Sequence, residues 1–217
     1  MIPTTEPILE KVLPSYSLSS SFALKEEILP YIKIGWHFHP EYELVLFTEG
    51  TGKRFIGDHT DNLNPSDLLL IGPNLPHYMR NDEKYYLGDS NLGIRAIVLH
   101  FRYDFIGDNF FDYPEMALIK KLLQNSSRGI QVLGKTRGAV AGKMEELLHI
   151  NGYERLRCLL DILHIISQST EQKLLSSIGF QNSFNLHDAE RINKVFSYIL
   201  KNFTEEVSLK ESAEQAH

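Results

Sequence analysis

Two histidines separated by one residue, followed by a glutamate and then by a third histidine, constrain this sequence more than any other feature. Side chains two residues apart on a β-strand point to the same face, so His37 and His39 share a face. Glu43 keeps this parity if the strand continues past Pro40. His77 follows the turn-forming residues Gly-Pro-Asn-Leu-Pro. The pattern predicts that three imidazoles and one carboxylate converge inside a small β-barrel.

Length and charge set the class of protein. With 217 residues the chain can bury one core of about 130–150 residues and add a smaller unit. The net charge of −6 argues against a protein that binds nucleic acid over its whole surface. No apolar run is as long as a membrane span, and no secretory signal is visible. The single cysteine, Cys158, suits a reducing compartment, so we expect a cytoplasmic protein without a membrane partner.

The first part of the chain reads as short apolar runs separated by turn-forming residues. The runs at 44–47 and 68–71 are apolar on both parities, which predicts strands buried on both faces. His59 is interpreted as a turn residue. Many short strands favour a mainly β fold, a barrel of the jelly-roll type. The predicted strands are 16–23, 31–38, 43–47, 53–56, 67–71, 77–79, 95–101 and 128–133.

Later in the chain the apolar spacing becomes helical, which predicts helices over 114–125, 136–150 and 153–169. Thr136 is the expected cap of the second helix. The second and third helices form a hairpin whose apolar stripe is wider than one covering layer needs, because Ile162 and Ile165 extend it. Two interpretations stay open. The hairpin either only covers the barrel, or uses part of its stripe as a homodimer interface.

The end of the chain changes in composition. Polar residues without a sustained period predict a linker between two units. After it, Asp188 is the expected cap of one helix, and Ser208 with Glu211 forms a capping box for another. The predicted organisation is a barrel with an N-terminal arm at 1–135, a helical hairpin at 136–169, a linker at 170–187 and a short helical unit at 188–217.

The order of the barrel residues resembles the two motifs of the cupin superfamily. The first motif is His-x-His, three residues, Glu, six residues, Gly, and it is met by His37, His39, Glu43 and Gly50. The second motif is met in part by His77 and Asn81. Its usual opening glycine is Ser66 here, and the glycine before the histidine is missing. The resemblance implies a double-stranded β-helix fold.

The whole arrangement resembles the AraC family of bacterial transcription regulators. The segments GDHTDNLNPSDLLLIGPNLPHY, FFDYPEMALIKKLL, SSRGIQVLGKTR and RINKVFSYILKNFTEEVSLKESAEQAH carry this resemblance. It implies a domain that senses a small-molecule effector (a sugar or another metabolite) and forms a homodimer, followed by a helix-turn-helix DNA-binding domain. Residues 188–217 would be only the first helices of that domain, so DNA binding is expected only from a full-length protein with its recognition helix. The resemblance implies a regulator and not an enzyme.

Two interpretations of the converging residues stay open. His37, His39, Glu43 and His77 are a ligand set that suits zinc, nickel, iron or manganese. Alternatively they line a metal-free cavity and bind the effector by hydrogen bonds, which is what resemblance to the AraC family implies. A complete ligand set also leaves an alternative function open, that of a metal-dependent cupin enzyme such as a dioxygenase or an isomerase.

Three further residues are candidates for binding the effector. Trp36 is the only tryptophan and could stack on a sugar ring. Arg54 could bind an anionic or hydroxylated ligand through two hydrogen bonds. Tyr78 lies next to His77 and could reach the same cavity. His100, in the strand predicted at 95–101, is interpreted as a residue of the sheet and not as a ligand.

Overall fold

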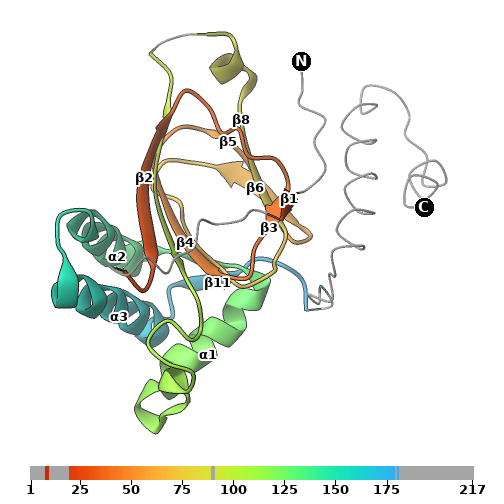
Figure 1. Cartoon of the computed structure of the whole chain (residues 1–217). Helices are drawn as coiled ribbons and strands as arrows, with labels where there is room; N and C mark the ends of the chain where they lie inside the picture. The colour runs from red at the N-terminus through yellow and green to blue at the C-terminus, as the bar shows by residue number, and fades with distance from the viewer. Residues whose placement is uncertain (1–7, 10–19, 89–90, 179, 181–217) are drawn as a thin grey trace.

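The computed structural model describes residues 8–9, 20–88, 91–178 and 180. Two β-sheets form a barrel, and the helices lie along the outside of one of these sheets (Figure 1). Most of the predicted arm falls outside the described residues. The same holds for the helix expected after Asp188 and for the capping box of Ser208 and Glu211.

The two sheets have five and six strands. The first contains, in spatial order, β1 (Ile8–Leu9), β3 (His37–Phe38), β8 (His77–Asn81), β5 (Gly52–Ile56) and β6 (His59–Leu63). The second contains β11 (Gln172–Leu174), β10 (Ile130–Val132), β7 (Leu68–Ile71), β4 (Tyr42–Glu49), β9 (Ile94–Phe101) and β2 (Ala23–Leu29). Neighbouring strands are antiparallel except β1 and β3. This mainly β architecture is the predicted jelly-roll barrel.

Strand β4 is buried on both faces, as its apolar sequence predicts. Leu44 and Leu46 belong to an outer cluster of apolar side chains between the second sheet and the helices. Val45 and Phe47 belong to an inner cluster inside the barrel. Glu43 has the parity of the inner residues, so the alternation of the strand turns this carboxylate into the barrel interior.

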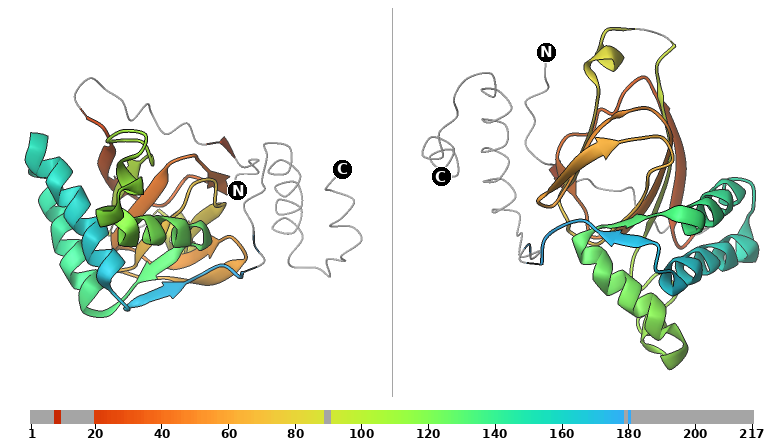
Figure 2. Two further views of the ribbon diagram at one scale, coloured as in Figure 1. Left: turned by 90° about the horizontal axis from the view of Figure 1, so that it is seen from below. Right: turned by 180° about the vertical axis from the view of Figure 1, so that it is seen from behind.

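Three α-helices cover the second sheet: α1 (Ala117–Asn125), α2 (Gly134–Leu147) and α3 (Gly152–Gln168). Figure 2 shows α2 and α3 side by side along the barrel. Ile162 is fully buried in the outer cluster, and Ile165 packs partly against it. Ile162 and Ile165, which widen the predicted apolar stripe, therefore make most of their contacts within this chain. In the described part of the chain, no helix combines the length and the apolar character that crossing a membrane requires.

The start of α2 differs from the prediction. The capping position is Leu133, and Thr136 lies inside the first turn. A carboxylate from outside the helix takes over the capping function, because Glu171 accepts hydrogen bonds of 2.8 Å from both the backbone N–H and the hydroxyl of Thr136. A negative charge at this end also complements the helix dipole. The contact is distant in sequence, which is why local pattern does not reveal it.

Two of the strands that the sequence pattern misses are polar strands at sheet edges. Residues 59–63 form β6, although His59 is interpreted as a turn residue. Residues 172–174 of the segment expected to be a linker form β11, in which Lys173 pairs with Gln131 of β10. An edge strand needs only its backbone to join a sheet, so its side chains can stay polar. The strand predicted at 16–23 overlaps β2 (Ala23–Leu29) only at Ala23, so the pattern also misses most of β2.

The chain after β11 connects the two sheets through packing and hydrogen bonds. Leu175 is 7% exposed and packs in the inner cluster. The hydroxyl of Ser176 donates to the carbonyl of Ile56, and the N–H of Ser177 donates to the carboxylate of Asp58. These bonds join the end of the second sheet to the β5–β6 turn of the first. This segment is therefore part of the barrel wall.

Replacing Leu175 by alanine is expected to lower the free energy of unfolding by about 2–5 kcal/mol, because it empties a space in the inner cluster. Leu174 is the matched control, since its side chain is 37% exposed. Leu174→Ala should change stability by only about 0.5 kcal/mol. Urea denaturation of both variants measures the difference, and equal losses would show that the segment does not close the barrel.

Candidate metal centre and effector cavity

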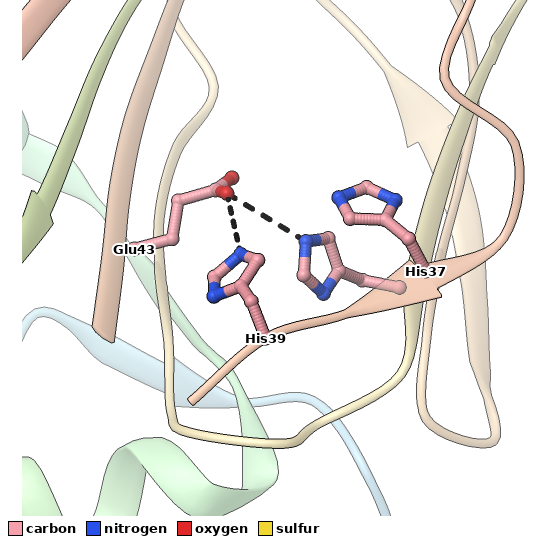
Figure 3. A group of neighbouring side chains, drawn as sticks. His37, His39 and Glu43 are labelled. Carbon is pink, nitrogen blue, oxygen red and sulfur yellow. Dashed lines mark hydrogen bonds and ion pairs between the residues drawn. The ribbon is translucent and has the colours of Figure 1, made fainter. Parts of the chain in front are cut away.

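Three strands, β3, β4 and β8, bring the motif residues together. His37 on β3 and His77 on β8 are direct partners across the sheet. Glu43 reaches the same place from β4 of the other sheet, and His39 follows β3. All four side chains are buried, and their candidate ligand atoms lie close together. Figure 3 shows His37, His39 and Glu43 around this centre. The structure thus brings together the four residues that the sequence singles out.

The remaining motif residues shape the backbone around this centre. Gly50 has φ of +102°, and a Cβ atom there would collide with the side chain of Ile94. Ser66 has φ of 71°, a conformation that favours glycine, which explains why cupin motifs carry glycine at this point. Asn81 accepts a hydrogen bond from Ile32 N–H and donates one to the carbonyl of Thr51. These residues hold the loops and do not contact the centre.

Each of the three motif histidines is held by a backbone carbonyl. The Nδ1 atoms of His37, His39 and His77 lie 2.9, 3.1 and 2.8 Å from carbonyl oxygens two residues away in the chain. A carbonyl only accepts hydrogen bonds, so each Nδ1 carries the proton. In a neutral ring, the lone pair is then on Nε2. This is how proteins orient histidines that bind metals.

The Glu43 carboxylate is surrounded by imidazoles. Its Oε2 atom lies 3.1 Å from Nε2 of His39 and 3.6 Å from Nε2 of His77. A further histidine, His100 on β9, places its own Nε2 2.9 Å from the same oxygen. His100 is the register partner of Glu43, which a sequence separation of 57 conceals. Sequence reasoning therefore missed the contact of His100 with this cluster, which only strand pairing reveals.

Electrostatics keep Glu43 ionised and His37 neutral. Burial alone would raise the pKa of Glu43, but the neighbouring imidazoles of His100, His39 and His77 outweigh it and hold that pKa well below its usual range. Burial, with the neighbouring His77, holds the pKa of His37 well below its usual range. A carboxylate anion and imidazole lone pairs facing one another repel unless a cation, either a proton or a metal ion, lies between them.

The residues fit a divalent metal. At a metal–nitrogen distance of about 2.0–2.1 Å, ligand atoms are about 3.4 Å apart in a tetrahedral centre and at most about 4.2 Å apart in an octahedral one. The candidate ligand atoms of His37, His39, Glu43 and His77 all lie within 4.8 Å of one another. In addition, His77 Nε2 is buried and has no hydrogen-bond partner among the described residues. A metal ion would satisfy that atom and relieve the repulsion around Glu43.

A small cavity opens beside this centre. Its volume is about 70 Å³, and His37, Glu43, His77 and His100 form its polar end. Its other walls come mainly from apolar side chains of both sheets, together with Lys25 and Glu27 of β2, which form an ion pair of 2.8 Å. The apolar wall residues are Leu29, Ile32, Ile34, Val45, Phe47, Met79, Ile94, Ala96 and Val98.

The other predicted ligand-binding residues lie elsewhere. Trp36, Arg54 and Tyr78 are not among the residues that line the cavity, and His39, although a candidate metal ligand, does not line it either. Arg54 is buried, and its guanidinium contacts Asp61 and Asp67 instead. The Tyr78 ring stacks on Phe55, with 5.7 Å between ring centroids. The structure therefore does not bring Trp36, Arg54 and Tyr78 into the cavity.

Acid is expected to destabilise the metal-free fold. The folded-state pKa of His37 is lowered from 6.5, so the unfolded state takes up a proton first and stability falls as the pH drops below 6.5. The folded-state pKa of Glu43 is lowered from 4.5, so a second loss begins below that pH. Each group contributes a slope of up to about 1.4 kcal/mol per pH unit.

Urea denaturation in chelator between pH 8 and pH 4 measures these losses. His37→Gln should remove the loss that begins near pH 6.5 while keeping the one that begins near 4.5. His164→Gln is the control, because that histidine is exposed on α3. An unchanged pH profile for His37→Gln would contradict the assignment.

Comparison with known proteins finds one matching family profile and several similar solved structures. The sequence profile of the AraC-like ligand binding domain matches residues 20–182. Among solved structures, the AraC-like transcriptional activator CuxR is similar, with 12% identity, a TM-score of 0.44, and coverage of 91% of this chain and 64% of CuxR. ToxT from Vibrio cholerae, in a structure with a bound unsaturated fatty acid, has 12% identity, a TM-score of 0.39, and coverage of 89% and 68%.

A Cupin 2 conserved barrel domain protein from Salinispora arenicola CNS-205 has 14% identity, a TM-score of 0.33, and coverage of 44% of this chain and 75% of that protein. No curated protein matches the sequence. The match covers 64% of CuxR, so this chain spans slightly less than two thirds of the length of that protein. Because the family profile covers most of the sequence, the chain belongs to the family of AraC-like ligand-binding domains.

Proposed function

We propose that this chain is the effector-sensing part of an AraC-type transcription regulator, and that its barrel binds a divalent metal and a small effector. The observation that carries the proposal is the convergence of three backbone-anchored imidazoles on one buried carboxylate, inside a domain of a ligand-binding family. His37, His39, Glu43 and His77 would hold the metal, with zinc, nickel, iron and manganese as candidates.

The cavity narrows the class of effector. The cavity, at about 70 Å³, is much smaller than the roughly 300–1,000 Å³ of most small-molecule pockets. Its walls are mostly apolar, and its polar end is the proposed metal centre. When bound, the metal supplies a Lewis-acidic position for an oxygen or nitrogen atom of the effector. We therefore infer an effector of few non-hydrogen atoms with one metal-binding group and an apolar remainder.

Thermal-shift screening of the metal-loaded protein against such compounds tests the effector site. A hit should raise the melting temperature of the parent chain and of Ala139→Leu, a control at an exposed position of α2. It should not stabilise Ala96→Leu, because the larger side chain fills the cavity that Ala96 lines. Equal stabilisation of Ala96→Leu and the parent would place the binding site outside the cavity.

A metal-dependent cupin enzyme is the second candidate function. The observation that favours it is the set of four protein ligands, which leaves open positions in an octahedral metal centre. Incubating each hit with the metal-loaded chain and analysing the compound by mass spectrometry separates the two functions. A regulator domain should return the compound unchanged, whereas conversion of the compound would favour the enzyme.

Coupling of the barrel to the rest of a regulator is proposed to run through the strands beside the metal centre. Strand β3 carries His37 and pairs with β1 of the N-terminal arm, with Ile8 opposite His37. Effector or metal binding would then favour one placement of the arm or of the hairpin. Hydrogen exchange at residues 8–9 and 37–38 should change when metal is added. Unchanged exchange at both strands would contradict the coupling.

Dimer formation and the division into domains remain proposals. The hairpin at 136–169 would supply the homodimer interface, and residues 188–217 would be the first helices of a helix-turn-helix DNA-binding domain. The face of α3 that would meet a partner bears the exposed Tyr153 and the half-buried Leu156 and Leu160. Sedimentation of the chain should show a dimer that Leu160→Glu converts to a monomer, and a monomeric parent would contradict the interface.

A further inference from the structure

His100 stands apart from the other histidines at the proposed metal centre. It comes from β9 and is 2% exposed. Its ring lies edge-on to that of His39, with centroids 4.9 Å apart. However, it does not belong to the group of ligand atoms that lie within 4.8 Å of one another. His100 thus contacts the ligand set at one side, through Glu43 and His39.

The two ring nitrogens of His100 have the opposite arrangement to those of the three motif histidines. Its Nε2 faces Oε2 of Glu43 at 2.9 Å, and an ionised carboxylate only accepts hydrogen bonds. Nε2 therefore carries the proton. Its Nδ1 is buried and has no hydrogen-bond partner within the part of the chain that the structure describes. His100 turns an N–H toward the centre, where the motif histidines turn lone pairs.

We propose that His100 is a positioning residue of the metal centre, and that its Nε2–H holds the Glu43 carboxylate in the orientation in which it faces the three ligand imidazoles. This inference rests on the metal centre proposed above. Ligating carboxylates are commonly held by such outer hydrogen bonds, and loss of one weakens metal binding by about 10–100-fold. Because His100 also lines the cavity, it lies between the effector and the metal ligand that it orients.

Two substitutions separate positioning from ligation and from simple packing. His100→Leu removes the donor but keeps a side chain of similar bulk. His100→Gln keeps an amide N–H that can reach the position of Nε2. Zinc affinity is measured by competition with a chromophoric chelator, and the absorption spectrum of the cobalt-loaded protein reports the ligand geometry. His164→Gln, at an exposed site of α3, is the control.

We expect His100→Leu to weaken zinc binding by about 10–100-fold and to change the cobalt spectrum, and His100→Gln to return affinity to within a few-fold of the parent. Parent-like affinity and spectrum in His100→Leu would overturn the inference. An equal loss in both variants would overturn it too, because it would indicate that His100 is itself a ligand or is needed for packing.

Long-range proton–nitrogen correlation spectra of the zinc-loaded parent test the same inference without any substitution. We expect His100 to carry its proton on Nε2, and His37, His39 and His77 to carry theirs on Nδ1. A proton on Nδ1 of His100 would overturn the inference. Failure of the parent chain to bind zinc, cobalt, nickel, iron or manganese would instead contradict the proposed metal centre, so the two failures are distinguishable.

Discussion

Replacing Glu43 by glutamine is expected to weaken zinc binding by about 100-fold or more and to remove most of the stability that zinc gives the fold. The change keeps the size of the side chain but removes the only carboxylate among the candidate ligands. Loss of a partner outside the ligand shell already weakens binding by about 10–100-fold, and a ligand should contribute at least as much.

The size of the effect follows from mass action. At a zinc concentration of about 1,000 times the parent dissociation constant, zinc should raise the free energy of unfolding of the parent by about 4 kcal/mol. At that concentration a variant that binds 100-fold more weakly should gain only about 1.4 kcal/mol. Urea denaturation with and without zinc measures both gains.

Glu49→Gln is the matched control, because Glu49 is an exposed residue at the other end of the same strand. Glu49→Gln should show the same zinc-induced increase in the free energy of unfolding as the parent. If Glu43→Gln gains as much as Glu49→Gln, the carboxylate at the centre does not bind the metal.

Replacing Asp67 by alanine should lower the free energy of unfolding by about 3–5 kcal/mol. The guanidinium of Arg54 is buried inside the barrel, and its Nε lies 3.7 Å from Asp67 Oδ2. Its Nη1 already lacks a hydrogen-bond partner among the described residues. Asp67 also accepts hydrogen bonds from Asn64 N–H and from the amide of Gln131 on β10. Loss of Asp67 would remove the hydrogen bonds that tie the turn at residues 64–67 to β10 of the second sheet. It would also leave the buried Arg54 guanidinium poorly compensated.

Asp61 provides the comparison for this prediction. Its Oδ2 lies 3.4 Å from Arg54 Nη2, but its side chain is 42% exposed, so water screens the pair. Asp61→Ala should therefore lower the free energy of unfolding by only about 1 kcal/mol or less. The double variant Arg54→Met, Asp67→Leu should recover much of the stability lost in Asp67→Ala. Denaturation curves in which Asp61→Ala and Asp67→Ala lose equal stability would contradict this account of Arg54.

The sequence predicts the barrel and its centre because both depend on strand alternation. Apolar residues on both parities of β4 indicate burial on both sides, which is a local property of a strand. The turn before His77 is also visible, because proline and glycine mark it. The continuous strand expected from His37 to Glu43 is wrong, because β3 ends at Phe38 and Glu43 lies on β4 of the other sheet.

What the sequence does not reveal depends on contacts between distant segments. His100 reaches Glu43 only through the pairing of β4 with β9. Glu171, which caps α2, follows α3 in the sequence and is therefore distant from the helix that it caps. The polar residues of β6 and β11 pair through their backbones, so their side chains give no strand pattern. Arg54 resembles a ligand-binding residue in the sequence, but it lies beside buried and half-exposed carboxylates in the fold.

The most direct test of the proposed metal centre is the metal content of the chain purified without a metal-affinity tag. Elemental mass spectrometry should find close to one zinc, nickel, iron or manganese ion per parent chain. The double variant His37→Ala, His77→Ala removes two of the four candidate ligands and should contain none. Absence of metal from the parent, or equal metal in the parent and the variant, would contradict the account.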